Sequence, residues 1–428
     1  MNAPAGGGKQ RDGRKKMTVE DKRPNSEGFD GVASAPGLGS RLKGLPNESW
    51  HLVLLGMFNA IAGGIFSFGF VLFLFRLHYD TTIQGYMMFM MEVTIALTIL
   101  PFGISAPKVG KRLMMMLGLG MTAMAYLTIS FSSEIWHFIM AMVLWGLGSS
   151  MISPTLSASL ADSVCDRDRK YLMNINAFFT MIASATGFFI SGLIVHFMGE
   201  VDGYRQLFRV AAATVLVAAF FLTRRIDCTC GPPAEIRKGA RKILPFVLPQ
   251  LVLGFGAGLV IPFFPVYFKL RFSTPDTLIS TIFTVTQVFW AVSYMAMPFF
   301  AEKAGSVKAL LVLQTMAVVA LFAIPMTPSF ESTAVLYAVR MILMNASRPL
   351  ADSYMMTLLG KDLRSTAVAA NQMAWMIPHM ISVAIGGFIM SRVSLELPFF
   401  ICGVMYVIST SLYAYFFMGR DDLQKAHE

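Results

Sequence analysis

The 428-residue chain has little charge and almost no cysteine. Only 14% of its residues are Asp, Glu, Lys or Arg, against roughly 25% in an ordinary soluble domain, and four are Cys. These shortages exclude a cytosolic multidomain enzyme and a disulfide-stapled scaffold. The chain also lacks a G-x-x-x-x-G-K-[ST] motif, a nucleophile–base pair and a metal-binding signature, so we expect no enzyme activity and no cofactor. It is instead strongly apolar, with 55% hydrophobic residues.

Long apolar runs separated by short polar segments begin after Trp50. A helix needs about 20 apolar residues to cross a bilayer, so the runs predict an all-α membrane protein with twelve transmembrane helices. The predicted spans are 50–77, 81–104, 113–131, 134–160, 171–195, 204–223, 243–268, 276–300, 308–327, 331–358, 371–391 and 397–417.

The predicted spans divide the chain into two six-helix bundles with polar segments around them. Residues 1–48 contain nine Lys or Arg but too little apolar surface to offset chain entropy, so we expect a disordered basic cytoplasmic tail. The first bundle takes 49–223 and the second 243–417, with a cytoplasmic linker at 224–242 and a short cytoplasmic tail at 418–428.

The distribution of positive charge predicts the orientation. With the N-terminus in the cytoplasm and residues 1–48 left aside, eighteen Lys or Arg fall on the inside and six on the outside or its margins. The positive-inside rule therefore places both termini in the cytoplasm. The net charge of +10 then reflects topology, and we expect no nucleic-acid partner. We expect a multi-pass monomer in the bacterial inner membrane, or a membrane derived from it.

A repeat with an offset of 195 residues relates the two bundles. It aligns Gly63 with Gly258, Pro154 with Pro349 and Gly192 with Gly387, among other landmarks. Because the offset covers six helices, both repeats cross the membrane in the same orientation. In proteins built this way the substrate is handled between the halves, near the midplane of the bilayer.

The segment Gly103-Ile-Ser-Ala-Pro-Lys-Val-Gly-Lys-Arg112 resembles the G-x-L-A-D-R-x-G-R-R signature of the major facilitator superfamily (MFS), and Ala301-Glu-Lys-Ala-Gly305 resembles its weaker second copy. The resemblance covers about residues 50–417 and implies the MFS fold. Pro107 replaces the signature's Asp, and Met142 stands where the family often has Arg, so the usual Asp–Arg latch is missing. A faint similarity to magnetosome-associated facilitators points to iron transport. The residues expected in cytoplasmic gating loops are Gly103, Lys108, Gly110, Lys111, Arg112, Glu302, Lys303 and Gly305.

Ionisable residues inside predicted spans are expensive and mark functional sites by default. Glu92 lies in the middle of the second span, and its repeat mate is Gln287. Glu92 is a candidate proton or cation carrier, or alternatively a carboxyl that fixes helix packing by hydrogen bonding.

The tenth span carries Arg340, Arg348 and Asp352 near one helix face. Arg348 and Asp352 can pair across one turn, as a structural salt bridge or a lock between halves. Arg340 is then the free cation, and its repeat mate is Trp145. An Arg facing a Trp across a cavity is suited to an anionic or aromatic substrate.

Other polar residues complete the predicted sites. Asn59, Gln250 and Gln287 are candidate cavity-lining residues, or ordinary hydrogen-bonding groups between helices. Arg76, Lys269 and Arg271 lie where two spans end, as an outer positive vestibule or as side chains that reach lipid head groups.

Together these features favour a secondary active transporter that moves a small solute by alternating access, with proton coupling (symport) through Glu92. The first alternative is a metal (for example iron) or organic-cation transporter that uses Glu92 and Asp352. The second is a sensor or scaffold that keeps the fold without transporting.

Overall fold

The computed structural model describes residues 46–164, 166–222, 240–304, 306–359 and 361–418. These segments are almost entirely helical, and nine of their helices are long and apolar enough to span a membrane. Taking α8, the 3-10 turn η1 and α9 as one interrupted segment, the described chain has twelve helical segments, as predicted. Residues 1–45 of the predicted tail (1–48), most of the linker and residues 419–428 lie outside the described residues.

The N-half is formed by the first six helices, several of which extend beyond the predicted spans. Polar residues prolong them at both ends, because helical hydrogen bonding continues past the apolar stretch. The helices are α2 (Asn47–Arg76), α3 (Thr81–Val109), α4 (Lys111–Phe131), α5 (Ile135–Asp162), α6 (Asp166–Met198) and α7 (Glu200–Phe220).

The C-half repeats this order after an interrupted first segment. Pro262 lies in the 3-10 turn between α8 and α9, where proline prevents a continuous α-helix. The elements are α8 (Ala240–Val260), η1 (Ile261–Phe263), α9 (Phe264–Phe272), α10 (Asp276–Ala304), α11 (Ser306–Ala323), η2 (Ile324–Met326), α12 (Phe330–Leu358), α13 (Lys361–Arg392) and α14 (Leu397–Phe417).

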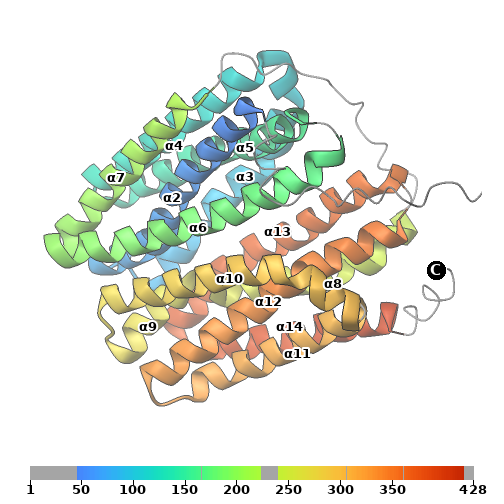
Figure 1. Cartoon of the computed structure of the whole chain (residues 1–428). Helices are drawn as coiled ribbons and strands as arrows, with labels where there is room; N and C mark the ends of the chain where they lie inside the picture. Colours follow the sequence, from blue (N-terminus) through green and yellow to red (C-terminus); the bar gives the residue numbers. More distant parts are fainter. Residues whose placement is uncertain (1–45, 165, 223–239, 305, 360, 419–428) are drawn as a thin grey trace, which may run out of the picture. The chain divides into compact units, whose positions relative to one another are not determined.

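The helix packing has the same repeat as the sequence. The N-half pairs α2–α6, α2–α7, α3–α5, α4–α5 and α4–α7 correspond to the C-half pairs α8–α13, α8–α14, α10–α12, α11–α12 and α11–α14. The two principal contacts between halves are also equivalent, since α6 packs on α10 and α13 packs on α3 (Figure 1).

Glycines permit these contacts between halves at repeat-related positions. A Cβ on Gly192 of α6 would lie 1.9 Å from Ser280 Oγ, and one on Gly387 of α13 would lie 2.3 Å from the Thr81 carbonyl oxygen. Thr81 in turn donates a hydrogen bond of 2.9 Å to the Gly387 carbonyl. Gly387 therefore meets the backbone of α3, and Gly192 makes room for the Ser280 side chain of α10. We call this the closed end; it includes Arg76, Thr81, Asp276 and Gly387.

The two halves separate toward the opposite end of the helices. Ile104 of α3 and Ala369 and Met373 of α13, with Pro154 of α5, line an apolar cavity of about 270 Å³ there. The same pair of helices is thus in close contact at Gly387 and apart at Met373. We call the region around Gly103, Ile104, Ala369 and Met373 the split end.

Replacing Gly387 with Ala should test the close contact between α3 and α13. The new methyl group would meet a backbone oxygen that cannot rotate away, and overpacking of this kind costs about 1–3 kcal/mol. We expect a lower unfolding temperature for the purified protein in detergent. Gly120→Ala is the matched control, because no atom lies within 4 Å of a Cβ there. Equal unfolding temperatures for the two variants would contradict the contact.

Candidate functional site

Glu92 is in direct contact with the other half of the molecule. Its Oε2 lies 2.9 Å from Nδ1 of His379 on α13, and both side chains are largely buried. The imidazole ring also stacks on Trp375, with ring centroids 4.3 Å apart. The predicted intramembrane carboxyl therefore belongs to a titratable pair that joins the halves.

Sequence reasoning did not identify His379 as the partner of Glu92. The sequence feature that could have revealed the pair is the similar depth of the two residues in the membrane. Glu92 comes eleven residues after Thr81, and His379 thirteen residues before Arg392. Both helices have those residues at the closed end, so the two side chains lie at similar depth. What the sequence did not provide was the packing of α3 on α13.

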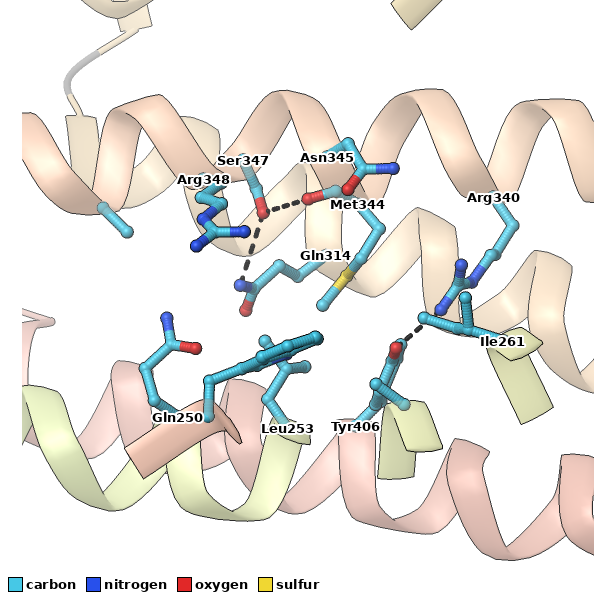
Figure 2. A pocket seen from close by; sticks show the side chains of 13 residues that line it. Gln250, Leu253, Ile261, Gln314, Arg340, Met344, Asn345, Ser347, Arg348 and Tyr406 are labelled. Carbon is cyan, nitrogen blue, oxygen red and sulfur yellow. Dashed lines mark hydrogen bonds between the residues drawn. The ribbon is translucent and has the colours of Figure 1, made fainter. Parts of the chain in front are cut away.

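The C-half contains a polar cavity of about 80 Å³ between its helices (Figure 2). Three of the predicted residues line it, namely Gln250, Arg340 and Arg348. Sequence reasoning missed Gln314, Trp375 and Tyr406. The full lining is Gln250, Leu253, Ala257, Ile261, Gln314, Arg340, Met344, Asn345, Ser347, Arg348, Ala351, Trp375 and Tyr406.

Arg340 is the most deeply buried cation of this cavity, with 1% of its surface exposed. Its Nη2 donates a hydrogen bond of 2.6 Å to the Tyr406 hydroxyl, and its guanidinium carbon lies 5.4 Å from the centre of the Tyr406 ring (Figure 2). Its Nε is buried without a hydrogen-bond partner. Among the described residues no carboxylate lies within ion-pair distance of Arg340, so its charge is met by dipoles and a ring face alone.

The one-turn ion pair predicted between Arg348 and Asp352 is absent from the described part of the chain. Both residues are exposed, and Arg348 points toward the cavity in Figure 2, while Asp352 is not part of its lining. Solvated side chains gain little from a one-turn pairing, which explains why the expected salt bridge does not form.

A second polar cavity, of about 250 Å³, lies in the N-half. Trp145 and Asn59 line it, as does Tyr126, whose hydroxyl accepts a 3.0 Å hydrogen bond from Trp145 Nε1. The expectation that Trp145 faces Arg340 across one cavity is therefore not met, since each lines the cavity of its own half. The remaining lining is Gly56, Ala60, Gly63, Thr122, Ser149, Ile152, Ser153, Leu156, Ser157, Asn176 and Thr180.

The two cavities are repeat-related but chemically different. The N-half cavity has no charged residue in its lining and is rich in hydroxyl and amide groups, whereas two guanidinium groups line the C-half cavity. Six lining positions correspond at the 195-residue offset: Trp145 with Arg340, Ser149 with Met344, Ile152 with Ser347, Ser153 with Arg348, Leu156 with Ala351 and Thr180 with Trp375.

The predicted outer vestibule is an ion-pair network at the closed end. Asp276 Oδ2 lies 2.9 Å from Arg76 of α2, and its Oδ1 lies 2.8 Å from Lys269. Arg271 pairs with Glu396. The Asp276 carboxylate also accepts a hydrogen bond from Tyr204 of the N-half. These cations therefore form ion pairs and make neither an open positive vestibule nor a set of side chains that reach lipid head groups. The sequence prediction was wrong because it considered Lys and Arg without their acidic partners.

The first signature loop also contains an ion pair. Gly110 ends α3 and precedes α4 with φ of 101°, a conformation that favours glycine. The next residue, Lys111, is buried and pairs with Asp162 at the end of α5. This ion pair joins the start of α4 to the end of α5. Lys108 and Arg112 are exposed, while Gly305 and the side chains of Glu302 and Lys303 lie outside the described residues.

Two further expectations concern Gln287 and metals. Gln287 is half-buried on α10 and lines neither polar cavity. Within the described part of the chain, no group of three or more His, Cys, Asp or Glu side chains gathers in a way that could hold a metal ion.

Repeated six-helix halves with apolar surfaces and polar internal cavities define a multi-pass membrane protein of the transporter class. The family model described as Major Facilitator Superfamily matches residues 52–245 and 246–428. The chain therefore belongs to the Major Facilitator Superfamily, as the signature segments predicted. No curated protein sequence matches the chain.

Solved structures of the same fold include transporters with different cargoes. A bacterial homologue of the human lysosomal transporter Spinster, inward-facing and unoccupied, is 14% identical with a TM-score of 0.72, covering 88% of this chain and 97% of that one. The nucleoside transporter NupG is 12% identical with a TM-score of 0.71, covering 87% and 100%. A bacterial homologue of the iron transporter ferroportin, inward-facing, is 11% identical with a TM-score of 0.70, covering 86% and 98%. At these identities the likeness establishes the fold.

Replacing Asp276 with Asn should weaken the closed end. The change removes the buried carboxylate between Arg76 and Lys269, and breaking a buried ion pair from one side costs about 3–5 kcal/mol. We expect a clearly lower unfolding temperature in detergent. Glu134→Gln is the control, because Glu134 is exposed and its contact with His137 is a weak surface pair. An unfolding temperature for Asp276→Asn as high as that of the control would refute the stabilising role of the Asp276 ion pairs.

Proposed function

We propose that the chain is a secondary transporter for a small organic anion, driven by proton coupling at Glu92 and His379. The observation that carries this proposal is Arg340, a buried guanidinium in a cavity whose lining contains no carboxylate. A charge inside a membrane protein is costly without a counter-charge. An anionic solute supplies that counter-charge, and a planar guanidinium binds carboxylate or phosphate groups through two hydrogen bonds.

The surrounding side chains favour an anion with a planar ring. Trp375 and Tyr406 line the same cavity as Arg340 and Arg348, so ring faces are available beside the positive charge. The cavity of about 80 Å³ is suited to the anionic group of a small solute. The neutral N-half cavity, lined by Trp145 and Asn59, offers hydrogen bonds to an uncharged part of the same or a related solute.

Alternating access is supported by the difference between the two ends. The contacts of α3 with α13 are tight at Gly387, and a cavity lies between the same helices at Met373. With the orientation expected from the positive-inside rule, the closed end faces outward and the split end faces the cytoplasm. On this proposal the closed end opens when the split end shuts, by rocking of the halves about the contact between them.

Proton coupling is supported by the chemistry of the pair between halves. A carboxylate and an imidazole 2.9 Å apart bind each other most strongly when Glu92 is ionised and His379 is protonated. Imidazole is also the side chain whose ordinary titration falls nearest neutral pH. Uptake or loss of a proton by the pair would therefore change how strongly the halves are held together.

The metal or organic-cation alternative uses Glu92 and Asp352 as ligands. Glu92 is already engaged by His379, and Asp352 is exposed outside the cavity lining, so the described geometry favours the anion. The scaffold alternative depends on the basic tail at 1–45, which lies outside the described residues. The bacterial inner membrane, the monomeric state and the cytoplasmic termini stay predictions.

Binding of small anions should raise the unfolding temperature of the purified protein. We expect stabilisation by benzoate or inorganic phosphate but not by the neutral benzamide, because a ligand that binds the folded state stabilises it. Arg348→Gln should weaken anion binding at least about tenfold, as expected for a hydrogen bond to a charged group. Arg112→Gln is the matched control, since Arg112 is exposed and far along the sequence from the cavity. Stabilisation by Fe²⁺ or tetramethylammonium, with none by anions, would favour the cation alternative instead.

Glu92→Gln should abolish proton-driven accumulation while leaving anion binding in place. Gln keeps a hydrogen bond to His379 but cannot ionise, so the pair loses its dependence on pH. The measurement is uptake of the stabilising anion into proteoliposomes, with and without an inward proton gradient. We expect wild-type uptake to depend on the gradient and the variant to equilibrate without it. Gradient-driven accumulation by Glu92→Gln would remove Glu92 from the coupling mechanism.

A further inference from the structure

Trp375 lies between the C-half cavity and the pair that joins the halves. One surface of its side chain lines the cavity together with Arg340 and Arg348. Its ring also stacks on the His379 imidazole at 4.3 Å and an interplanar angle of 23°. His379 in turn contacts Glu92 of the N-half at 2.9 Å. A single aromatic side chain therefore touches both the space for a solute and the titratable contact between halves.

The backbone of this part of α13 has little freedom to move. A Cβ on Gly254 of α8 would lie 2.2 Å from the Trp375 carbonyl oxygen, and one on Gly258 would lie 2.3 Å from the His379 carbonyl oxygen. α8 and α13 are thus in backbone contact at both residues. A change in the cavity must reach His379 through side chains rather than through a shift of α13 against α8.

The pair is also the last polar contact described between α3 and α13 on the way to the split end. On the closed-end side of His379 lie the Gly387 contacts. On the split-end side, Met376, one turn away from His379, lines the apolar cavity. Of the neighbouring helices, α8 places Gly258 against the His379 carbonyl oxygen, and α5 places Gly146 against Met91 and Thr94. The charged groups on the cavity side of Trp375 are Arg340 and Arg348.

We propose that Trp375 is the positioning residue that couples occupancy of the C-half cavity to the Glu92–His379 contact. This deepens the proposed function and depends on it for the identity of the solute and for the titration of the pair. The ring face of Trp375 holds the His379 imidazole in the orientation that points its Nδ1 at Glu92 Oε2. A solute that displaces the ring would remove this support from the contact between the halves. Linkage makes the effect reciprocal, so protonation of the pair changes solute affinity by the same factor.

The test measures the distance across the split end as a function of pH. Spin labels are placed with Ile104→Cys and Met373→Cys, two exposed positions on opposite helices of that cavity, after Cys165, Cys228 and Cys230 are changed to Ser. The distance distribution is recorded in detergent at about pH 8 and about pH 5.5, a range that includes ordinary imidazole titration. We expect the wild-type population to shift between the two values.

Three variants separate the explanations. Trp375→Leu should lose the pH response, as Glu92→Gln should. In both variants the ratio of the two distance populations should differ from the wild-type ratio by about tenfold, as for loss of a hydrogen bond to a charged group. Trp375→Phe should keep it, because a ring still stacks on His379. Trp136→Leu is the control: it removes an exposed tryptophan that lines neither polar cavity, so its pH response should stay. A wild-type pH response in Trp375→Leu would overturn the inference.

A second arm adds benzoate or inorganic phosphate at fixed pH. In the wild type we expect the anion to shift the distance distribution, and in Trp375→Leu we expect the anion to bind, by thermal stabilisation, without shifting it. If no anion stabilises or shifts the distances of any variant, while the pH response still requires Trp375, the proposed anion transport is refuted. The proposed role of Trp375 in coupling is then supported. If anions shift the distances equally in wild type and Trp375→Leu, the coupling residue fails and the anion proposal stands.

Discussion

A charge inside a bilayer must have a partner, and in this protein a key partner comes from the other half of the molecule. Glu92 contacts His379 across the two halves, and neither residue has a titratable repeat mate, since Gln287 and Ser184 occupy the equivalent positions. The pair therefore breaks the internal symmetry of the fold at one point. An isolated carboxyl at this depth would be costly. The packing of α3 against α13 is therefore coupled to the contact between Glu92 and His379.

Close backbone packing gives that contact its place. Gly192 and Gly387 are repeat mates, and each lets its helix approach the other half closely, Gly387 against the α3 backbone and Gly192 against the Ser280 side chain. Substitution by a larger residue would separate the helices and carry Glu92 away from His379. The glycines thus determine the distance between the halves at the closed end, and the ion pairs around Asp276 add charge complementarity across the same surface.

Much of the fold and only part of the site could be predicted from the sequence. The twelve segments and the 195-residue repeat follow from apolar runs and from Gly and Pro landmarks, because these features act locally and the bilayer sets helix length. Arg340, Gln250 and Trp145 were found because polar residues inside spans stand out. Their partners were not found, since Tyr406, Tyr413 and Tyr126 come from other helices. The expectation that Trp145 and Arg340 share one cavity was wrong for the same reason: repeat alignment gives equivalent positions, not contacts.

The chemical difference between the two cavities constrains any transport cycle. On the mechanism proposed above, closing the split end over an empty C-half cavity would bring Arg340 and Arg348 together without a carboxylate in the cavity lining, and like charges in a poorly hydrated space repel. An anion bound between them would remove that cost. The N-half cavity would impose no such penalty, because its mates at these positions, Trp145 and Ser153, are neutral. The barrier to movement of the empty carrier would therefore reside in one half, and an anionic solute would lower it by the charge it brings.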